Sequence, residues 1–200
     1  MASSDSPEHH LSLLDKLLEN CNALSIRLNT KKLTILHPDL TIVGFRYHLG
    51  KLSIPVARAN AIAEHPTPTT AKRLRGLTGH IDYYGPTIPK LAEIKLPLHR
   101  IEQEFKTKKY IKWTEEGLRA LEDVKAAVAN SISLSPLMVN EPIFMSSDAS
   151  CHTVAGLIWQ KDPETGENRY LGASSRLLDK REQRWSTFRK ETAAVLLMLH

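Results

Sequence analysis

The sequence has few cysteines and no long apolar run. Its 200 residues include two cysteines, Cys21 and Cys151, which lie far apart and belong to no metal-ligand spacing. A disulfide framework and a zinc site are therefore not predicted. No stretch approaches the roughly 18 consecutive apolar residues of a membrane span, and residues 1–5 lack the basic-then-apolar order of a signal peptide. We therefore expect an intracellular protein, cytoplasmic or nuclear.

The positive charge is concentrated in the middle of the chain. The formal net charge is +5, and residues 46–112 hold thirteen Lys/Arg against five Asp/Glu, whereas the flanking segments are slightly acidic. A basic segment attracts polyanions by releasing their counterions, so nucleic acid is the first partner to consider. A solvated basic surface without a partner is the competing interpretation.

Hydrophobic periodicity predicts a mainly helical first part and a strand-rich second part. A change from helical to strand periodicity after Pro136 places a domain boundary near residue 140. Caps and prolines delimit the helices. Helices are expected to begin at residues 7, 113 and 186 and after residue 69 or 70, and to span residues 56–64 and 90–104. Strands are expected over residues 32–36, 41–49, 142–148, 153–160 and 169–174. The strand over 41–49 should form a hairpin whose second strand passes through residues 52–54.

Two carboxylates stand at positions that should be buried. Glu191 shares a helix face with Ala194, Val195 and Met198, and Asp148 ends the apolar strand segment 143–145, expected to be central in its sheet. Two such carboxylates repel each other unless a divalent cation neutralises them, and oxygen ligands suit Mg²⁺. An ordinary structural role for each acid is the alternative, and spacing alone favours it.

The order of motifs along the whole chain resembles the polymerase polyprotein of long-terminal-repeat retrotransposons of the Ty3/Gypsy type. The matching segments are Leu28–Lys32 ("L-N-x-x-K"), Ile42–Phe45 ("F-L-G"), His65–Thr69 with Leu74–Gly79 and Tyr83-Tyr84 ("P-x-P-T … L-R-x-x-x-G-x-x-x-Y-Y-R"), Ser147–Ser150 ("T-D-A-S"), Ser174–Leu178 ("S-R-x-L") and Lys190–Ala194 ("K-E-x-x-A"). Such a long collinear series is more specific than any single motif.

The resemblance implies a fold and a division of the chain. It implies an α+β region followed by an α/β region: reverse-transcriptase thumb and connection helices with a primer-grip-like hairpin, then a truncated RNase H-like mixed sheet with one helix. The expected parts are residues 1–55, the end of the polymerase palm with the hairpin, residues 56–139, the helical thumb and connection, and residues 140–200, the beginning of the RNase H-like domain.

The resemblance also implies a parent activity and its ligands. The parent enzyme would copy RNA into DNA and cleave RNA in RNA–DNA hybrids, with Mg²⁺ as cofactor and the hybrid or a template–primer as partner. Asp148 and Glu191 would be the catalytic, metal-binding carboxylates. Residues expected to contact nucleic acid are Gly44 and Phe45 of the primer-grip-like hairpin, with Gly44 allowing close approach of the backbone. The basic middle segment adds Lys72, Arg73, Arg75, Lys106, Lys108 and Lys109 as candidates for phosphate contacts.

Several departures from the family pattern limit the expected activity. The chain contains no Asp-Asp pair and stops before the later acids of the RNase H fold. Thr153–Ala155 replaces a Gly-x-Gly, and Gly85 stands where the family has arginine. We therefore expect a chain that binds nucleic acid, is inactive alone and needs the rest of the polyprotein for activity. The alternatives are a host-retained, non-enzymatic nucleic-acid or protein-binding module and a non-functional remnant.

Overall fold

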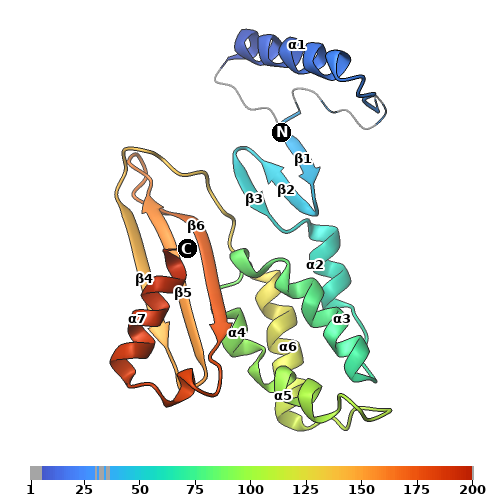
Figure 1. The fold of residues 1–200 in the computed structure, drawn as a ribbon, viewed down its shortest axis with the longest axis vertical. Helices are drawn as coiled ribbons and strands as arrows, with labels where there is room; N and C mark the ends of the chain where they lie inside the picture. Colours follow the sequence, from blue (N-terminus) through green and yellow to red (C-terminus); the bar gives the residue numbers. More distant parts are fainter. Residues whose placement is uncertain (1–5, 30, 32–33, 35–36, 200) are drawn as a thin grey trace. The chain divides into compact units, whose positions relative to one another are not determined.

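The computed structural model describes residues 6–29, 31, 34 and 37–199 and divides the chain into two compact units, residues 1–37 and 38–200. The first unit contains α1 (Pro7–Ala23) (Figure 1). Ser6 caps α1 by accepting a hydrogen bond from the His9 N–H at 3.1 Å, and Pro7 occupies the first turn, as the sequence predicts. The strand expected over 32–36 falls largely outside the described residues.

The second unit begins with a small antiparallel sheet of β1 (Asp39–Ile42), β2 (Phe45–His48) and β3 (Lys51–Ser53), in that order. The single strand predicted over 41–49 is wrong, because the chain turns at Val43 and Gly44, whose φ angles are 47° and 80°. Ile42 pairs directly with Phe45 across this two-residue turn. Two successive positive φ angles are typical of the tight turns that match strand twist, and glycine adopts them without strain.

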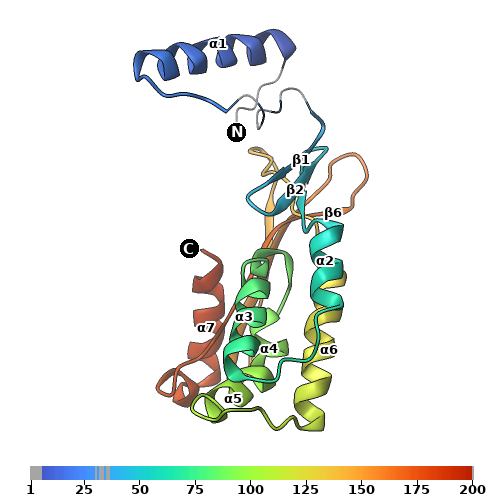
Figure 2. The same ribbon diagram turned by 90° about the vertical axis from the view of Figure 1, so that its right-hand side faces the viewer.

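A group of short helices follows the small sheet and forms the larger core. These are α2 (Val56–Ala63), α3 (Ala71–Asp82), the 3₁₀ turn η2 (Gly85–Thr87), α4 (Leu91–Ile94), α5 (Leu96–Glu104) and α6 (Glu115–Ala129) (Figures 1 and 2). Thr70 and Thr114 cap α3 and α6 through their side-chain oxygens. The most deeply buried side chains of this core are Leu74, Ile81, Ile88, Leu98, Leu121, Val124 and Val128.

The last part is a second antiparallel sheet crossed by one helix. It contains β4 (Ile143–Ala149), β5 (Thr153–Lys161) and β6 (Asn168–Leu177), then the 3₁₀ turn η3 (Glu182–Arg184) and α7 (Thr187–Met198). The order is β4-β5-β6, so β4 is an edge strand among the described residues, and the expectation of a central strand there is wrong. All described pairings in this sheet are antiparallel.

The core of this second sheet is small. α7 packs on β4 and β5 through Ala194, which is fully buried against Val154 and Leu178, with Ala149 and Leu197 at the margin. The sheet also contacts the helical part of the same unit, since the Ser135 N–H donates to the Tyr170 carbonyl at 2.7 Å. The expected boundaries at residues 55 and 139 stay predictions. Within the described part of the chain, no helix is both long and apolar enough to cross a membrane.

Candidate functional site

The turn between β1 and β2 is fastened to the end of α3 by aromatic residues. The Tyr84 hydroxyl donates to the Gly44 carbonyl at 3.2 Å, and the Tyr83 hydroxyl donates to the Val43 carbonyl. The Phe45 ring lies 5.2 Å, centroid to centroid, from each of the two tyrosine rings. A Cβ at Gly44 would stand 3.3 Å from the Tyr83 ring. Gly44 therefore permits the close approach of turn and helix, and Phe45 is a packing residue.

Two hollows follow the exposed side of α3, starting at this turn. The first, of about 500 Å³, is lined by Val43, Gly44, Arg58, Gly79, His80, Tyr83 and Tyr84. The second, of about 610 Å³, continues to the linker and is lined by Arg58, Ala61, Ile62, His65, Pro66, Thr67, Pro68, Thr69, Arg73, Gly76, Leu77, His80 and Tyr84. They share Arg58, His80 and Tyr84, and we call the combined surface the α3 groove. Its floor is smooth at Gly76 and Gly79, where no atom lies within 4 Å of an added Cβ.

Positive charge lines the α3 groove. Arg58 on α2 and Arg73 on α3 are exposed, and neither forms an ion pair with another residue that the structure describes. Lys72 is exposed beside Arg73. Reasoning from sequence singled out Lys72 and Arg73 but missed Arg58, His80 and the two glycines. The spacing of Arg73, Gly76 and His80, three and seven residues along one helix, was the available signal.

Three of the four other basic residues expected to contact nucleic acid interact with neighbouring side chains of the protein. The Arg75 guanidinium donates to the carboxylate of Glu102, a buried residue. Lys108 pairs with Glu104 at 3.2 Å and lies 4.2 Å from the centroid of the Phe105 ring. The Lys109 ammonium lies over the Tyr110 ring at 5.4 Å. Lys106 is exposed, without an ion pair to any described residue. The nucleic-acid roles of these four residues stay predictions, and Arg75 has an evident structural partner.

Asp148 is bound by a lysine from the helical part. The Lys90 ammonium donates to the Asp148 carboxylate at 2.5 Å, and both side chains are about half exposed. The hydrogen bond from Lys90, its positive charge and the Ala149 backbone N–H lower the pKa of Asp148. The hydrogen bond to Asp148 and the attraction of that carboxylate raise the pKa of Lys90. The partner that Asp148 requires is thus supplied by the chain itself.

Glu191 lies on α7, and α7 packs on one face of the second sheet, the face that carries Ala149 and Val154. Side chains alternate along a strand, and Ala149, next to Asp148, packs against the cluster that contains Ala194 of α7. By this alternation Asp148 points to the face of the sheet opposite α7, and no hydrogen bond joins it to Glu191 in the described part of the chain. Among the described residues, no three His, Cys, Asp or Glu side chains gather into a group able to hold a metal ion. This arrangement does not fit a Mg²⁺ site, and the metal-binding roles of both carboxylates stay predictions.

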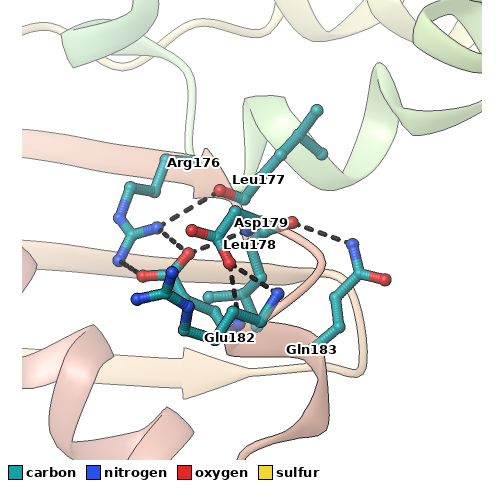
Figure 3. Close-up of polar contacts among 7 residues, drawn as sticks. Arg176, Leu177, Leu178, Asp179, Glu182 and Gln183 are labelled. Carbon is teal, nitrogen blue, oxygen red and sulfur yellow. Dashed lines mark hydrogen bonds and ion pairs between the residues drawn. The ribbon is translucent and has the colours of Figure 1, made fainter.

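The loop that leads from β6 to α7 is held by a polar network (Figure 3). The Arg176 guanidinium donates two hydrogen bonds to Glu182, at 2.7 and 2.8 Å, and the Asp179 N–H donates a third at 2.8 Å. These bonds stabilise the carboxylate, with the Arg176 bonds contributing most, and lower the pKa of Glu182 to about 2. Gln183 donates to the Leu178 carbonyl at 2.8 Å. Arg176, part of the "S-R-x-L" motif, thus links the end of β6 to η3.

Comparisons with known proteins agree with these features. Residues 113–200 match the family described as the RNase H-like domain found in reverse transcriptase. The Pol polyprotein of transposon opus from Drosophila melanogaster is 24% identical over 98% of this chain and 20% of its own length. The Gag-Pol polyprotein of gibbon ape leukemia virus is 28% identical over 92% of this chain and 11% of its own length. The chain thus spans a fifth or less of these relatives.

The fold is also similar to that of a solved structure. The foamy viral protease–reverse transcriptase in complex with an RNA/DNA hybrid has a TM-score of 0.78 and 22% sequence identity, covering 98% of this chain and 26% of that protein. The fold predicted from the motifs is therefore confirmed. In sequence and fold the chain is similar to the reverse transcriptase and RNase H region of retrotransposon and retroviral Pol polyproteins, and its residues 113–200 match the RNase H-like domain found in reverse transcriptase.

Proposed function

We propose that this chain binds an RNA–DNA hybrid, or a related template–primer duplex, in the α3 groove. The observation that carries the proposal is the combination of a glycine-lined floor with two exposed arginines, Arg58 and Arg73, that form no ion pair with any residue the structure describes. Arginine is suited to phosphate recognition, because its planar guanidinium donates paired hydrogen bonds to phosphate oxygens. The similar fold of a foamy viral enzyme in complex with an RNA/DNA hybrid supports the choice of ligand.

The glycines and the turn explain how a duplex could approach. Gly76 and Gly79 leave the backbone of α3 uncovered, so a sugar–phosphate chain can lie against the helix without displacing side chains. The first hollow ends at the Val43–Gly44 turn, which Tyr83 and Tyr84 hold in place. Contacts of this kind bind the backbone of the duplex and carry no sequence preference. Lys72 adds positive charge next to the groove.

The activity proposed for the whole protein is RNA-directed DNA synthesis with cleavage of RNA in the hybrid. In that setting this chain contributes duplex binding. RNase H-like domains of reverse transcriptases generally depend on divalent metal, and the whole protein is proposed to share that dependence. In the structure the Asp148 carboxylate forms an ion pair with Lys90.

The test is the salt dependence of hybrid binding. Fluorescence anisotropy with a labelled RNA–DNA hybrid would be measured over a series of salt concentrations for the wild-type chain and for Arg58→Ala/Arg73→Ala. Each phosphate contact contributes about −0.9 to the slope of log K against log salt, so the double variant should lose about two units of slope. Its affinity at low salt should also fall.

The matched control removes two arginines away from the groove. Arg119 on α6 is 80% exposed at its side chain, and Arg181 lies in the loop before η3. Arg119→Ala/Arg181→Ala lowers the net charge by the same amount and should leave the slope near that of the wild type. Equal losses of slope in the two double variants would show diffuse charge attraction and would reject the groove.

A further inference from the structure

The segment between α5 and α6 is an exposed basic loop (Figure 1). Residues 106–112, which we call the lysine loop, contain no acidic residue and four lysines, all of them exposed: Lys106, Lys108, Lys109 and Lys112. Among the residues that the structure describes, Lys108 pairs with the Glu104 carboxylate at 3.2 Å, and both of these side chains are about half exposed. Exposed pairs of this kind are weak. The lysine loop therefore presents positive charge that can attract a polyanion.

Two hydrogen bonds fix the lysine loop at one end of the α3 groove. The Ile111 N–H donates to the Thr69 carbonyl at 2.9 Å, and the Trp113 indole N–H donates to the Pro68 carbonyl at 2.9 Å. Pro68 and Thr69 line the groove where it meets the start of α3, and the Val43–Gly44 turn lies at its other end. Ile111 is buried, and Trp113 packs against the core of the helices. The loop is thus anchored next to the groove.

Tyr110 presents an aromatic ring to solvent at this anchor. It directly precedes Ile111 and is 59% exposed, and the Lys109 ammonium lies 5.4 Å from the centroid of its ring. An exposed ring beside lysines is the combination with which proteins hold single-stranded nucleic acid, because the ring stacks on a base and the ammonium groups contact phosphates. Bases inside a duplex are already covered by their neighbours, so the Tyr110 ring can stack on an unpaired base.

We propose that the lysine loop binds a single-stranded extension of the duplex that lies in the α3 groove, with Tyr110 stacking on an unpaired base and the loop lysines contacting phosphates. The inference rests on the proposed function, because the groove brings the end of the duplex to the loop. It also narrows the ligand, since a hybrid with a single-stranded extension should bind more tightly than a blunt one. Stacking of this kind has little sequence preference, because every base has a flat face.

The test compares a blunt RNA–DNA hybrid with the same hybrid carrying a DNA extension of about four nucleotides on its 5′ or its 3′ side. Binding of each hybrid to the intact chain would be measured by fluorescence anisotropy. At least one extension should tighten binding by the wild type about tenfold, as expected for one stacked base. Tyr110→Ala should remove most of this gain, expressed as the ratio of the two affinities, and Tyr110→Phe should keep it because the ring remains.

Matched controls separate the lysine loop from the groove. Phe188→Ala removes a ring on α7 that is 79% exposed and should keep the wild-type ratio. Arg58→Ala/Arg73→Ala tests the groove, because it should weaken both hybrids, whereas a single-stranded DNA oligonucleotide reports on the loop alone and should lose affinity about tenfold in Tyr110→Ala.

Three results would overturn the proposal, whatever the groove variant shows. They are no gain from either extension in the wild type, the same gain in the wild type and Tyr110→Ala, and a loss in Phe188→Ala as large as that in Tyr110→Ala. If the groove variant binds the blunt hybrid as the wild type does while the Tyr110 effect on the single strand persists, the proposed function fails and the loop site stands.

Discussion

The Arg176–Glu182 pair makes the stability of the second sheet depend on acid pH. Glu182 accepts three hydrogen bonds, and its side chain is 14% exposed, whereas that of Arg176 is 41% exposed. The pKa of Glu182 falls from 4.5 to about 2 on folding. After allowance for solvent screening at the exposed arginine, we expect the pair to contribute about 1 to 2 kcal/mol at neutral pH.

The sign follows from the direction of the pKa shift. A carboxylate whose pKa is lowered by folding stabilises the protein above its unfolded pKa, and the contribution is lost as the pH falls through the folded value. The contribution of Glu182 should therefore be complete above about pH 5, half lost near pH 3 and gone below pH 2. Other carboxylates of the protein also change their protonation over this pH range. The free-energy contribution of the Arg176–Glu182 pair must therefore be measured separately from theirs.

A double-mutant cycle isolates the pair. Glu182→Gln, Arg176→Met and the double variant would be unfolded in urea at several pH values, with tryptophan fluorescence as the readout, because Trp185 directly follows η3. The coupling free energy should be about 1 to 2 kcal/mol at pH 7 and should fall steadily below pH 5. A coupling energy that is zero at pH 7, or that does not change between pH 5 and 3, would refute the reasoning.

Two more substitutions test the packing and the assignment of charges. Arg75→Ala leaves the buried Glu102 without its partner, so we expect the free energy of unfolding in urea to fall by about 1 to 2 kcal/mol. The salt slope of hybrid binding should change little. A slope change as large as that of Arg58→Ala/Arg73→Ala would show that Arg75 contacts the hybrid. Leu121→Ala, at a residue that is 1% exposed, should lower the free energy of unfolding by about 2 to 5 kcal/mol. Leu118→Ala, at a residue that is 42% exposed, should lower it far less. Similar losses in the two variants would contradict the packing of α6.

Local features of the fold were predictable from neighbouring residues. Ser6, Thr70, Thr114 and Ser186 each cap the helix expected after them, because a cap depends on residues two or three positions away. The turn at Val43 and Gly44 was missed, since the β-rich composition of residues 41–49 outweighed the single glycine there. Gly44 was the one local signal for two strands instead of one.

Long-range pairing was beyond the reach of sequence patterns. Arg75 meets Glu102 across 27 residues and Lys90 meets Asp148 across 58, and both contacts depend on how helices and strands pack. The motif series located Asp148 correctly at the end of a strand, but the edge position of β4 and its lysine partner came from tertiary structure. In the same way, the α3 groove draws Arg58 from a different helix than Arg73.

The most direct test of the central claim is to map where an RNA–DNA hybrid protects the chain. Hydrogen–deuterium exchange would be compared with and without the hybrid for the intact chain at low salt. Duplex binding in the α3 groove predicts protection at the Val43–Gly44 turn and in the segment from Arg73 to His80, with no change on β4. Protection confined to other surfaces, or none along α3 under conditions where the hybrid is bound, would contradict the account.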